Sequence, residues 1–539
     1  MPIIKSTSMP TWKDVNRWLA MGVLLGLPWS LASAGPGSGK SQPHVLLILV
    51  DDMGYGDIGA FNPASRIPTP HLNQLAEEGM RFTDAHAPGA VCHPSRYGLI
   101  TGRYPFRTDV SVWPEKPVID SGRVTVAAFL KSQGYRTAMV GKWHLGFDES
   151  QAVAATGSQV SGNSNNSAAY RVYQTRQRLP GGPVDCGFES FFGIRASTDI
   201  PPYFFIRNDR VEIPPTDTVS DNGSDGWTAI QGAFWRKGGI APGMDLANVL
   251  PQFSQEAARI IHEHGYRDPD TPLFLYVALP APHTPWLPAA KYSGISGAGD
   301  YGDFVAMVDA EIGAILSALQ NAGMAEETLV IFASDNGPVW YPRDIDRFGH
   351  HAGAGLRMDA DGKIANVSYR GMKGDAYEGG HHMPFIVRWP GRVAPGAITG
   401  QTISFTDVMA TLADLLDVGL PTGAAEDSFT LLPVFLGKQP ESRAIRPAVV
   451  SVSARGVKSI QNRGWKLIEA LGSGGFTQPA AVEPMVDGPS GQLYHLRNDP
   501  EEQVNVWLEH PEVVHEMTKL LRKWEQQEAS RTTTTGYTF

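Results

Sequence analysis

The sequence predicts an α/β fold in which a large, mixed but mostly parallel sheet is sandwiched by helices and followed by a smaller antiparallel sheet with one helix. Three observations predict this fold class. Apolar runs without alternation recur along the chain, as expected for strands buried on both faces of a sheet. Amphipathic helical stretches separate these runs. After about residue 440, short strand-like runs follow one another without intervening helices.

The first residues have the composition of a secretory signal peptide. Basic residues precede an apolar run over 18–27, and Ala32-Ser33-Ala34 offers a small-residue cleavage site. The apolar run is short for a membrane span. We therefore expect the signal peptide 1–34 to be cleaved near Ala34 and the mature protein to be secreted or periplasmic. An uncleaved membrane anchor is the alternative.

Four apolar runs are predicted as buried central strands, and each ends in polar residues. The runs cover 44–50, 137–141, 273–279 and 329–334. The polar residues that follow them are, in chain order, Asp51 and Asp52, then Lys142 and His144, then His283, and finally Asp335 and Asn336. Open α/β sheets bind ligands beyond the carboxyl ends of their strands, so we expect a site at this edge.

Helical spacing predicts helices between and after these strands. Apolar residues recur at helical intervals over 71–79, 304–322 and 406–416, and again over 511–527 near the end of the chain. Short strands are expected at 448–453, 464–469 and 491–496.

These elements divide the chain into two expected domains. The main, catalytic domain is predicted to span 35–438, and a small α+β domain 439–530. Residues 531–539 are predicted to be a disordered tail.

Two polar stretches are predicted to be insertions. Residues 150–182 are rich in Ser, Asn, Gln and Gly, and residues 338–368 are rich in Asp, Gly, Arg and His. Long polar segments near a site often shape substrate binding. A loop without any role is the alternative for each.

Composition and charge narrow the function classes. The 539 residues are 42% hydrophobic, which supplies a large core, and carry a formal net charge of −10. This acidic balance argues against non-specific nucleic-acid binding. The sequence has no second long apolar run, so we expect no stable membrane insertion of the body. An anionic substrate would have to be attracted by a local basic pocket.

The run from Val91 to Arg103 is the most informative motif in the chain. Cys92 stands two residues before Pro94-Ser95, a pair that favours a helix start, so the thiol is expected near unpaired N–H groups and the positive end of a helix dipole. Arg96 adds a permanent positive charge. This combination suits a tetrahedral oxyanion such as sulfate or phosphate. A buried structural cysteine is the alternative reading.

The same run resembles the signature of the type I sulfatases, which belong to the alkaline-phosphatase superfamily. The resemblance rests on Cys92, on Pro94-Ser95-Arg96 and on Thr101-Gly102-Arg103, with Ile100 in a slightly variable position. In that family a modifying enzyme converts the cysteine to Cα-formylglycine. The resemblance therefore implies that Cys92 is the formylglycine precursor and that a formylglycine-generating or equivalent maturation enzyme is a partner.

The resemblance extends over nearly the whole mature chain and implies a metal site. It assigns one divalent ion, expected to be Ca²⁺, to the modified Cys92 together with Asp51, Asp52, Asp335 and Asn336. Hard oxygen ligands in an irregular arrangement suit calcium better than magnesium. It also implies an active-site set that consists of Arg96, Lys142, His144, His283 and Lys373.

The activity that the resemblance implies is hydrolysis of sulfate monoesters by the hydrated formylglycine. Asp335 would accept the proton of the attacking hydroxyl, and His283 would protonate the departing alcohol. His144 would deprotonate the second hydroxyl so that sulfate leaves. The charges that offset the equatorial sulfate oxygens would come from Arg96, Lys142 and Lys373.

Three departures from the family pattern bear on substrate preference rather than on the reaction. His382 stands where many relatives have Arg, His495 replaces an Asp, and the insertion 338–368 lengthens the spacing between Asn336 and Lys373. Three further histidines are candidate substrate-pocket residues, namely His350, His351 and His381.

The sulfate is expected to be carried by a carbohydrate. This expectation rests on the secretory signal and on residues placed near the predicted mouth of the site, namely Tyr203, Trp286 and Trp340. Two alternatives remain open. One is a phosphate ester or phosphonate hydrolase of the same superfamily, and the other is an inactive sulfatase-like carbohydrate-binding protein in which Cys92 stays a thiol.

Cys186 is the only other cysteine of the chain. Two cysteines in a secreted protein usually pair. Because the resemblance reserves Cys92 for modification, we expect no disulfide and interpret Cys186 as a small buried hydrophobic residue.

Overall fold

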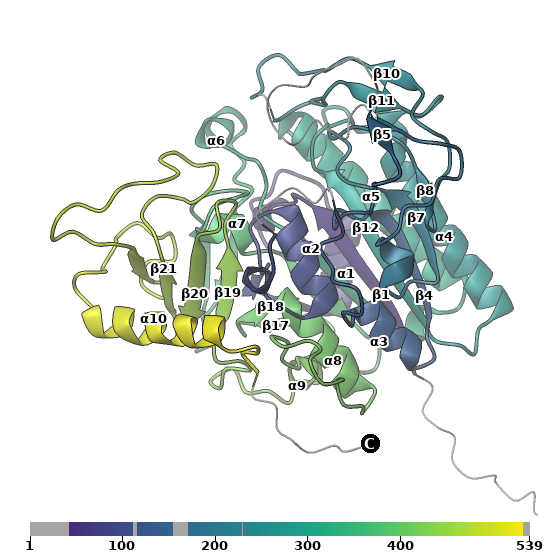
Figure 1. Cartoon of the computed structure of the whole chain (residues 1–539). Coiled ribbons are helices and arrows are strands. Elements are labelled where there is room, and N and C mark those ends of the chain that lie inside the picture. Colours follow the sequence, from purple (N-terminus) through teal and green to yellow (C-terminus); the bar gives the residue numbers. More distant parts are fainter. Residues whose placement is uncertain (1–41, 111–115, 155–170, 229, 360, 532–539) are drawn as a thin grey trace, which may run out of the picture. The chain divides into compact units, whose positions relative to one another are not determined.

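The computed structural model describes residues 42–110, 116–154, 171–228, 230–359 and 361–531 (Figure 1). The predicted signal peptide and all but the first residue of the predicted tail lie outside these residues. The chain from Gln42 onward forms one compact unit, and the boundary at 438–439 stays a prediction. None of the described helices is both long and apolar enough to cross a membrane.

A ten-stranded mixed sheet forms the centre of this unit. From one edge to the other its strands are β17 (Ala397–Thr399), β2 (Met80–Phe82), β16 (Phe385–Arg388), β13 (Thr328–Ser334), β1 (His44–Asp51), β12 (Leu273–Pro282), β4 (Arg136–Lys142), β7 (Ser190–Ile194), β8 (Ile206–Arg207) and β9 (Arg210–Val211). The four predicted central strands are β13, β1, β12 and β4, which are neighbours and run parallel. The predicted fold class and these four strands are confirmed.

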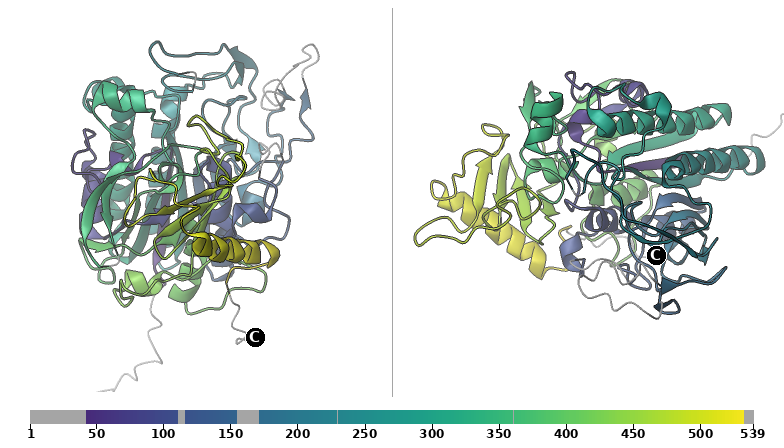
Figure 2. Two further views of the ribbon diagram at one scale, coloured as in Figure 1. Left: turned by 90° about the vertical axis from the view of Figure 1, so that its left-hand side faces the viewer. Right: turned by 90° about the horizontal axis from the view of Figure 1, so that it is seen from above.

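Helices cover both faces of the sheet, which explains why its central strands lack apolar alternation. Leu46, Ile48 and Val50 of β1 pack with one set of helices, α1 (Pro70–Glu78), α4 (Val249–Arg267) and α5 (Gly299–Asn321). Val45, Leu47 and Leu49 pack with the other set, α2 (Cys92–Thr101), α3 (Val126–Ser132) and α8 (Val408–Leu415). The view from above in Figure 2 shows α4 and α5 side by side on one face.

Helix α5 begins five residues earlier than its predicted start at Phe304. Its first turn contains Gly299 and Gly302, which the sequence pattern favours as loop residues. Tertiary contacts override that preference, because Tyr301 is buried and Asp303 accepts hydrogen bonds from the backbone N–H groups of Gly294 and Ser296.

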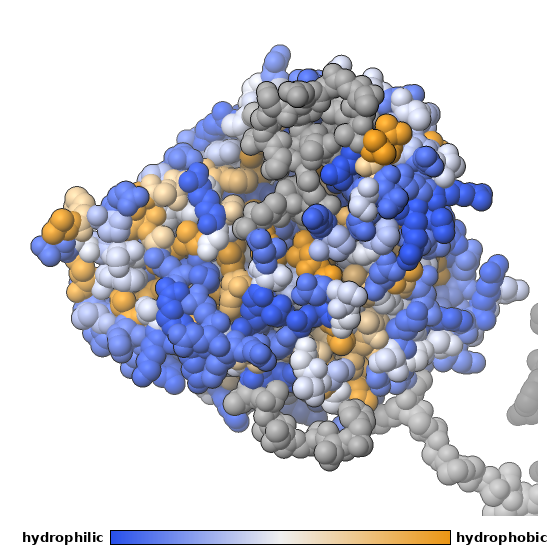
Figure 3. Space-filling view, viewed as in Figure 1, coloured by the Kyte–Doolittle hydropathy of each residue, from blue (hydrophilic) through white to orange (hydrophobic). Residues whose placement is uncertain are grey.

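A four-stranded antiparallel sheet follows in the last quarter of the chain. Its strands are β19 (Val449–Val452), β20 (Lys458–Asn462), β21 (Trp465–Ile468) and β22 (Gln492–His495). Helix α10 (Pro511–Gln526) packs its apolar side on this sheet through Met517, Leu521 and Trp524. Figure 3 shows a mostly hydrophilic surface where α10 lies in Figure 1. Strand β20 was not predicted because Ile460 is its only strongly apolar residue, and its pairing with strands on both sides stabilises it.

The second predicted insertion is folded rather than a plain loop. Residues 338–368 contain α6 (Pro342–Phe348) and a hairpin of β14 (Ala354–Met358) and β15 (Ile364–Ser368). In the first insertion, residues 155–170 lie outside the described part, and the flanking β5 (Val153–Ala154) pairs with β6 (Arg171–Val172). The other short elements are β3 (Ala85–His86), β18 (Ile403–Ser404), β10 (Asp217–Val219), β11 (Gly238–Ile240), α7 (Glu378–His381) and α9 (Leu432–Phe435).

A buried charge cluster joins the antiparallel sheet to α7. Lys466 on β21 is fully buried, and its Nζ lies 2.9 Å from Glu378 Oε1 and 2.8 Å from Glu502 Oε1. Burial, together with the nearby charge of Glu378, raises the pKa of Glu502 to about 7. One ammonium group therefore neutralises a pair of carboxyl groups that water does not reach.

We expect Lys466→Met to lower the free energy of unfolding by about 3–5 kcal/mol, because it leaves two buried carboxyl groups without their cation. Urea unfolding of the purified protein measures this loss. Lys458→Met is the matched control on neighbouring β20, since Lys458 is partly exposed and pairs with Glu469 and Glu525. Its effect should stay below about 1 kcal/mol. Equal stability of the two variants would contradict the structural role of the cluster.

Candidate active site

The carboxylates of the site follow two adjacent parallel strands. Val50 of β1 lies opposite Ser334 of β13, so Asp51-Asp52 and Asp335-Asn336 leave the sheet side by side. Asp52 adopts a φ of 65°, in the left-handed region that residues other than Gly seldom occupy. Its backbone N–H donates to Asp335 Oδ1 at 3.3 Å. All four side chains are buried.

Helix α2 begins at Cys92, as predicted from the Pro-Ser pair. The Cys92 Sγ atom lies 3.2 Å from Asp51 Oδ1 and 3.4 Å from Lys373 Nζ. Burial, and then the charge of Asp51, raises the pKa of the Cys92 thiol well above its usual range. An unmodified Cys92 would therefore stay a neutral thiol and a poor nucleophile.

Three cations surround the carboxylates. Arg96, one turn into α2, approaches Asp335 Oδ2 with Nε at 2.9 Å and Nη2 at 2.8 Å. Lys142, at the end of β4, donates to Asp51 Oδ2 and, at 2.6 Å, to Ser197 Oγ. Lys373 Nζ lies 2.6 Å and 2.8 Å from the two carboxylate oxygens of Asp52.

These cations set the protonation of the carboxylates. Burial alone would raise the pKa of Asp51, but Lys142, His283 and Arg96 outweigh burial and hold this pKa far below its usual range. Burial and the repulsion of Asp51 raise the pKa of Asp335 to about 7, despite the nearby Arg96 and Lys142. The three carboxylates thus still repel one another.

Two histidines lie beside this cluster in different environments. His144 follows β4 with a φ of 57°, and burial together with Lys142 lowers its pKa well below the usual value. His144 is therefore neutral near pH 7 and can accept a proton. His283 Nδ1 lies 2.7 Å from the backbone oxygen of Thr284, which only accepts hydrogen bonds, so Nδ1 carries a proton. His283 Nε2 faces Asp52 Oδ2 at 3.6 Å.

The residues present fit a hard divalent cation. Ligand atoms of Asp51, Asp52, Asp335 and Cys92 all lie within 4.8 Å of one another. Asn336 donates through Nδ2 to Asp52 at 2.6 Å, while its buried Oδ1 has no hydrogen-bond partner. Converging carboxylates and an unpartnered amide oxygen are the donors that calcium prefers.

Comparison with known proteins identifies the family. The profile of the Sulfatase family matches residues 43–418. The chain is 32% identical to an N-acetylgalactosamine-6-O-sulfatase of Bacteroides thetaiotaomicron, over 90% of this chain and 93% of that protein. It is 31% identical to human arylsulfatase A, over 90% and 86% of the two chains.

The chain belongs to the sulfatase family.

A solved structure supports the same assignment. A Bacteroides thetaiotaomicron protein, described in connection with the metabolism of multiple glycosaminoglycans, superimposes with a TM-score of 0.72 and 29% identity. The alignment covers 90% of this chain and 100% of that chain. The resemblance inferred from the Cys92 motif is thereby confirmed, and the protein is a sulfuric ester hydrolase.

Two residues of this sulfatase site were missed in the sequence. Ser197 Oγ accepts a hydrogen bond from Lys142, and Asp199 Oδ1 lies 3.8 Å from His283 Nδ1. Both follow β7, which pairs with β4 in the parallel part of the sheet. Lys142 and His283 were predicted because polar residues beyond the carboxyl end of a buried strand are expected to form the site. Residues 191–194 are such an apolar run, so the same argument would have indicated Ser197 and Asp199.

The three candidate pocket histidines have partners of their own. His350 is buried and its Nε2 lies 2.8 Å from Asp57, whereas His381 lies between His86 and Lys466. His351 is partly buried, and its Nδ1 accepts a hydrogen bond from the backbone of Gly353. The hydrogen bonds of these three histidines are made with residues other than those assigned to the reaction, and their role as substrate-pocket residues stays a prediction.

The predicted aromatic mouth is wrong. Tyr203, Trp286 and Trp340 are all buried. Trp286 and Trp340 both pack against Tyr301 of α5, and Tyr203 donates its hydroxyl to the backbone oxygen of Arg236. Large aromatic side chains gain more from this packing than from exposure, so they offer no surface on which a sugar could stack.

Cys186 is buried, as predicted, and burial raises its thiol pKa to about 12. Both cysteines of this sulfatase are free thiols in the structure.

Proposed function

We propose that this sulfatase hydrolyses sulfate monoesters of a carbohydrate through a formylglycine made from Cys92. The observation that carries the proposal is the position of Cys92. It opens α2 as a buried, neutral thiol, between Asp51 on one side and Lys373 on the other. A thiol held in its neutral form has little use as a nucleophile, whereas an aldehyde hydrate at the same atom would offer two hydroxyl groups.

The side chains around Cys92 support a role in each half of the reaction. One hydroxyl of the hydrate attacks sulfur and its proton passes to Asp335, while the S–O bond to the sugar breaks and His283 protonates the sugar oxygen. His144, which is neutral, then takes the proton of the second hydroxyl. The C–O bond to sulfate breaks and the aldehyde forms again. The positive charges facing the sulfate oxygens come from Arg96, Lys142 and Lys373.

The metal site would hold Ca²⁺ through Asp51, Asp52, Asp335 and Asn336, together with an oxygen of the modified Cys92. When bound, this ion supplies positive charge that polarises a sulfate oxygen and lowers the pKa of a nearby hydroxyl. Burial and the repulsion of Asp51, which raise the pKa of Asp335 to about 7, and the unpartnered Asn336 Oδ1 support the assignment.

Sulfate is favoured over phosphate by charge. A sulfate monoester carries one negative charge, whereas a phosphate monoester carries nearly two. The cations Arg96, Lys142 and Lys373 already neutralise carboxylates, so the site has limited capacity for further negative charge. The names of the relatives support a sugar as the carrier of the sulfate, since one is an N-acetylgalactosamine-6-O-sulfatase.

Secretion is part of this proposal. The segment 1–34 supports export to the periplasm or out of the cell, and maturation would need a formylglycine-generating enzyme in the producing host. These points rest on the sequence alone.

Two measurements on one preparation test the function. Peptide mass spectrometry should find the Cys92 thiol replaced by an aldehyde in active enzyme. In addition, kcat/KM should be higher for 4-nitrophenyl sulfate than for 4-nitrophenyl phosphate, and higher still for one member of a panel of sulfated saccharides. Higher efficiency on the phosphate would assign the protein to phosphate esters instead. Activity confined to aryl sulfates would contradict the proposal of a carbohydrate substrate. An active enzyme with an intact Cys92 thiol would contradict the proposal of a formylglycine nucleophile.

A further inference from the structure

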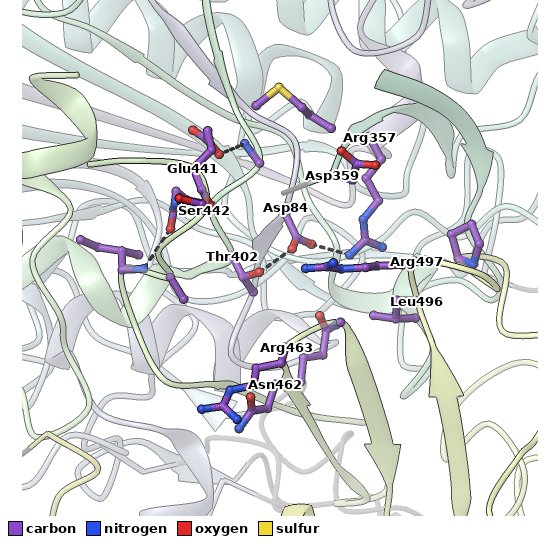
Figure 4. A pocket seen from close by; sticks show the side chains of 18 of the residues that line it. Asp84, Arg357, Asp359, Thr402, Glu441, Ser442, Asn462, Arg463, Leu496 and Arg497 are labelled. Atoms are coloured by element: carbon purple, nitrogen blue, oxygen red, sulfur yellow. Dashed lines mark hydrogen bonds and ion pairs between the residues drawn. The ribbon is translucent and has the colours of Figure 1, made fainter. Parts of the chain in front are cut away.

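A cavity that shares no residue with the Cys92 site is lined by more cations than anions. It has a volume of about 730 Å³ and contains none of the residues assigned to the reaction. Six Lys and Arg residues line it against three acidic residues, in a chain whose formal net charge is −10. Figure 4 shows side chains from three parts of the chain around it, including Arg357, Arg463 and Arg497.

Four of these cations have no counter-ion. Within the described ranges, no ion pair forms to the exposed side chains of Lys363, Arg443, Arg463 and Arg497. Like charges gathered without anions repel one another, so a bound anion would relieve that repulsion. The three acidic residues of the cavity do not pair with these four cations. Asp359 accepts hydrogen bonds from the backbone N–H groups of Asp361 and Lys363. Asp84 bonds His86, Arg357 and Thr402, and Glu441 bonds Thr399 and the backbone of Gly400.

Arg357 supplies a fixed donor at the base of the cavity. It lies on β14, its side chain is 14% exposed, and one nitrogen is held 3.2 Å from Asp84 Oδ1. The other terminal nitrogen, Nη1, is buried without a hydrogen-bond partner and lies 3.9 Å from Glu378 Oε2, so Arg357 is held in place by two carboxylates. A cation fixed in this way adds positive charge to the cavity without having to be ordered when a ligand binds.

Backbone contacts hold two of the exposed arginines, Arg463 and Arg497, close to each other in the lining of the cavity. Arg463 occupies the two-residue turn between β20 and β21 with a φ of 51°, a conformation that usually selects Asn, Asp or Gly. Gly464 accepts a hydrogen bond from Leu496 N–H, which brings the next residue, Arg497, to the same turn. A Cβ atom at Gly464 would lie 3.2 Å from Arg497 Nε, so the glycine leaves room for this guanidinium.

The size and chemistry of the cavity indicate its ligand. Its volume is in the range that holds ligands of several rings, far more than a lone oxyanion needs. Asn462, Thr402 and Ser442 add uncharged hydrogen-bonding groups between the cations. Eight residues separate Asp84 in the cavity from Cys92, so their Cα atoms lie at most about 29 Å apart. A chain of sugars could contact both.

We propose that this cavity is a second binding site for a sulfated saccharide, which retains a segment of the substrate chain away from the sulfate that reacts. The choice of saccharide rests on the proposed function, whereas the anion site rests on the cations alone. Binding at a second point on one chain raises the effective concentration of sulfate groups near Cys92. The site would therefore act on long substrates only.

The test is a double substitution, Arg463→Gln with Arg497→Gln, in the full mature enzyme. For sulfated polysaccharide we expect KM to rise about tenfold with kcat unchanged, because two charge-assisted contacts are lost. The kcat/KM for 4-nitrophenyl sulfate should stay within about twofold. The matched control, Arg267→Gln with Lys519→Gln, removes the same charge from exposed side chains elsewhere and should change neither value. An unchanged KM for polysaccharide would overturn the proposal.

Direct binding separates the ligands. In a Cys92→Ala background, which prevents turnover, calorimetry would measure the affinity for chondroitin 6-sulfate and heparin hexasaccharides, their desulfated forms, and sodium sulfate. We expect the double substitution to weaken binding of at least one sulfated hexasaccharide about tenfold and to leave the desulfated forms unaffected. If sodium sulfate binds as tightly as the sulfated hexasaccharides, and the double substitution weakens its binding as well, the saccharide assignment is overturned. If the double substitution weakens binding of a sulfated hexasaccharide but the active enzyme hydrolyses no member of the saccharide panel, the binding site is supported and the proposed function is contradicted.

Discussion

Replacing Cys92 by Ala should lower kcat/KM for 4-nitrophenyl sulfate by a factor of about 10⁴ or more, the size of loss seen when a nucleophile is removed. Alanine cannot be converted to formylglycine, so no hydroxyl remains at this position to attack sulfur. The cations around the site would still bind the sulfate group. We therefore expect the affinity for a sulfate ester to fall much less than the turnover number.

The fold should survive this substitution. Cys92 Sγ contacts Asp51 and Lys373, both of which keep stronger partners in Lys142 and Asp52. Cys186→Ala is the matched control, because it removes the only other thiol of the chain. Its activity should stay within about twofold of the wild type, since Cys186 packs in the core. Full activity of Cys92→Ala with a normal unfolding curve would refute the proposed nucleophile.

The central sheet was predictable because its strands are buried on both faces. The interior of such a strand, as in residues 45–50 of β1, is apolar at every position, whereas an amphipathic helix alternates apolar and polar faces. Strand β20 lacked this signal, since Lys458 and Gln461 occupy it beside Ile460. Its pairing with β19 and β21 is a tertiary effect that a local pattern does not contain.

The candidate site was predictable to the extent that strand ends determine it. Asp51 and Lys142 end β1 and β4, and Asp335 follows β13. These strands are parallel and lie in the order β13, β1, β12, β4, so the topology brings the three residues to one edge of the sheet. Lys373 follows no such strand, and only the resemblance indicated it. The cavity around Arg463 and Arg497 combines a hairpin turn with a segment that follows another strand, a contact that neither stretch of sequence reveals alone.

The error on the aromatic residues has a different origin. Trp286 and Trp340 lie close in sequence to polar site residues, which suggested a sugar-binding surface. Their rings turn into the core instead and pack on Tyr301. Sequence proximity to a strand end places the backbone of a residue, whereas the direction of a large side chain depends on which neighbours can cover it.

Replacing Asp52 by Asn should remove the bound metal. The proposed site has three carboxylates, and the loss of one lowers both the charge and the number of hard donors that a divalent ion requires. Elemental analysis of purified protein should find about one calcium per chain in the wild type and less than about 0.1 in Asp52→Asn. Because the metal contributes charge at the reacting sulfate, kcat should fall about 10³-fold or more.

A stability measurement separates this effect from a local disturbance of Lys373, which pairs with Asp52. A ligand that binds only the folded state raises the unfolding temperature, so a chelator should lower the melting temperature of the wild type and leave that of Asp52→Asn unchanged. Asp199→Asn is the control. Asp199 lies beside His283 but outside the group of converging ligand atoms, so this variant should keep its metal and its response to chelator even where its activity falls. A fully active wild-type enzyme that contains no metal would exclude the site.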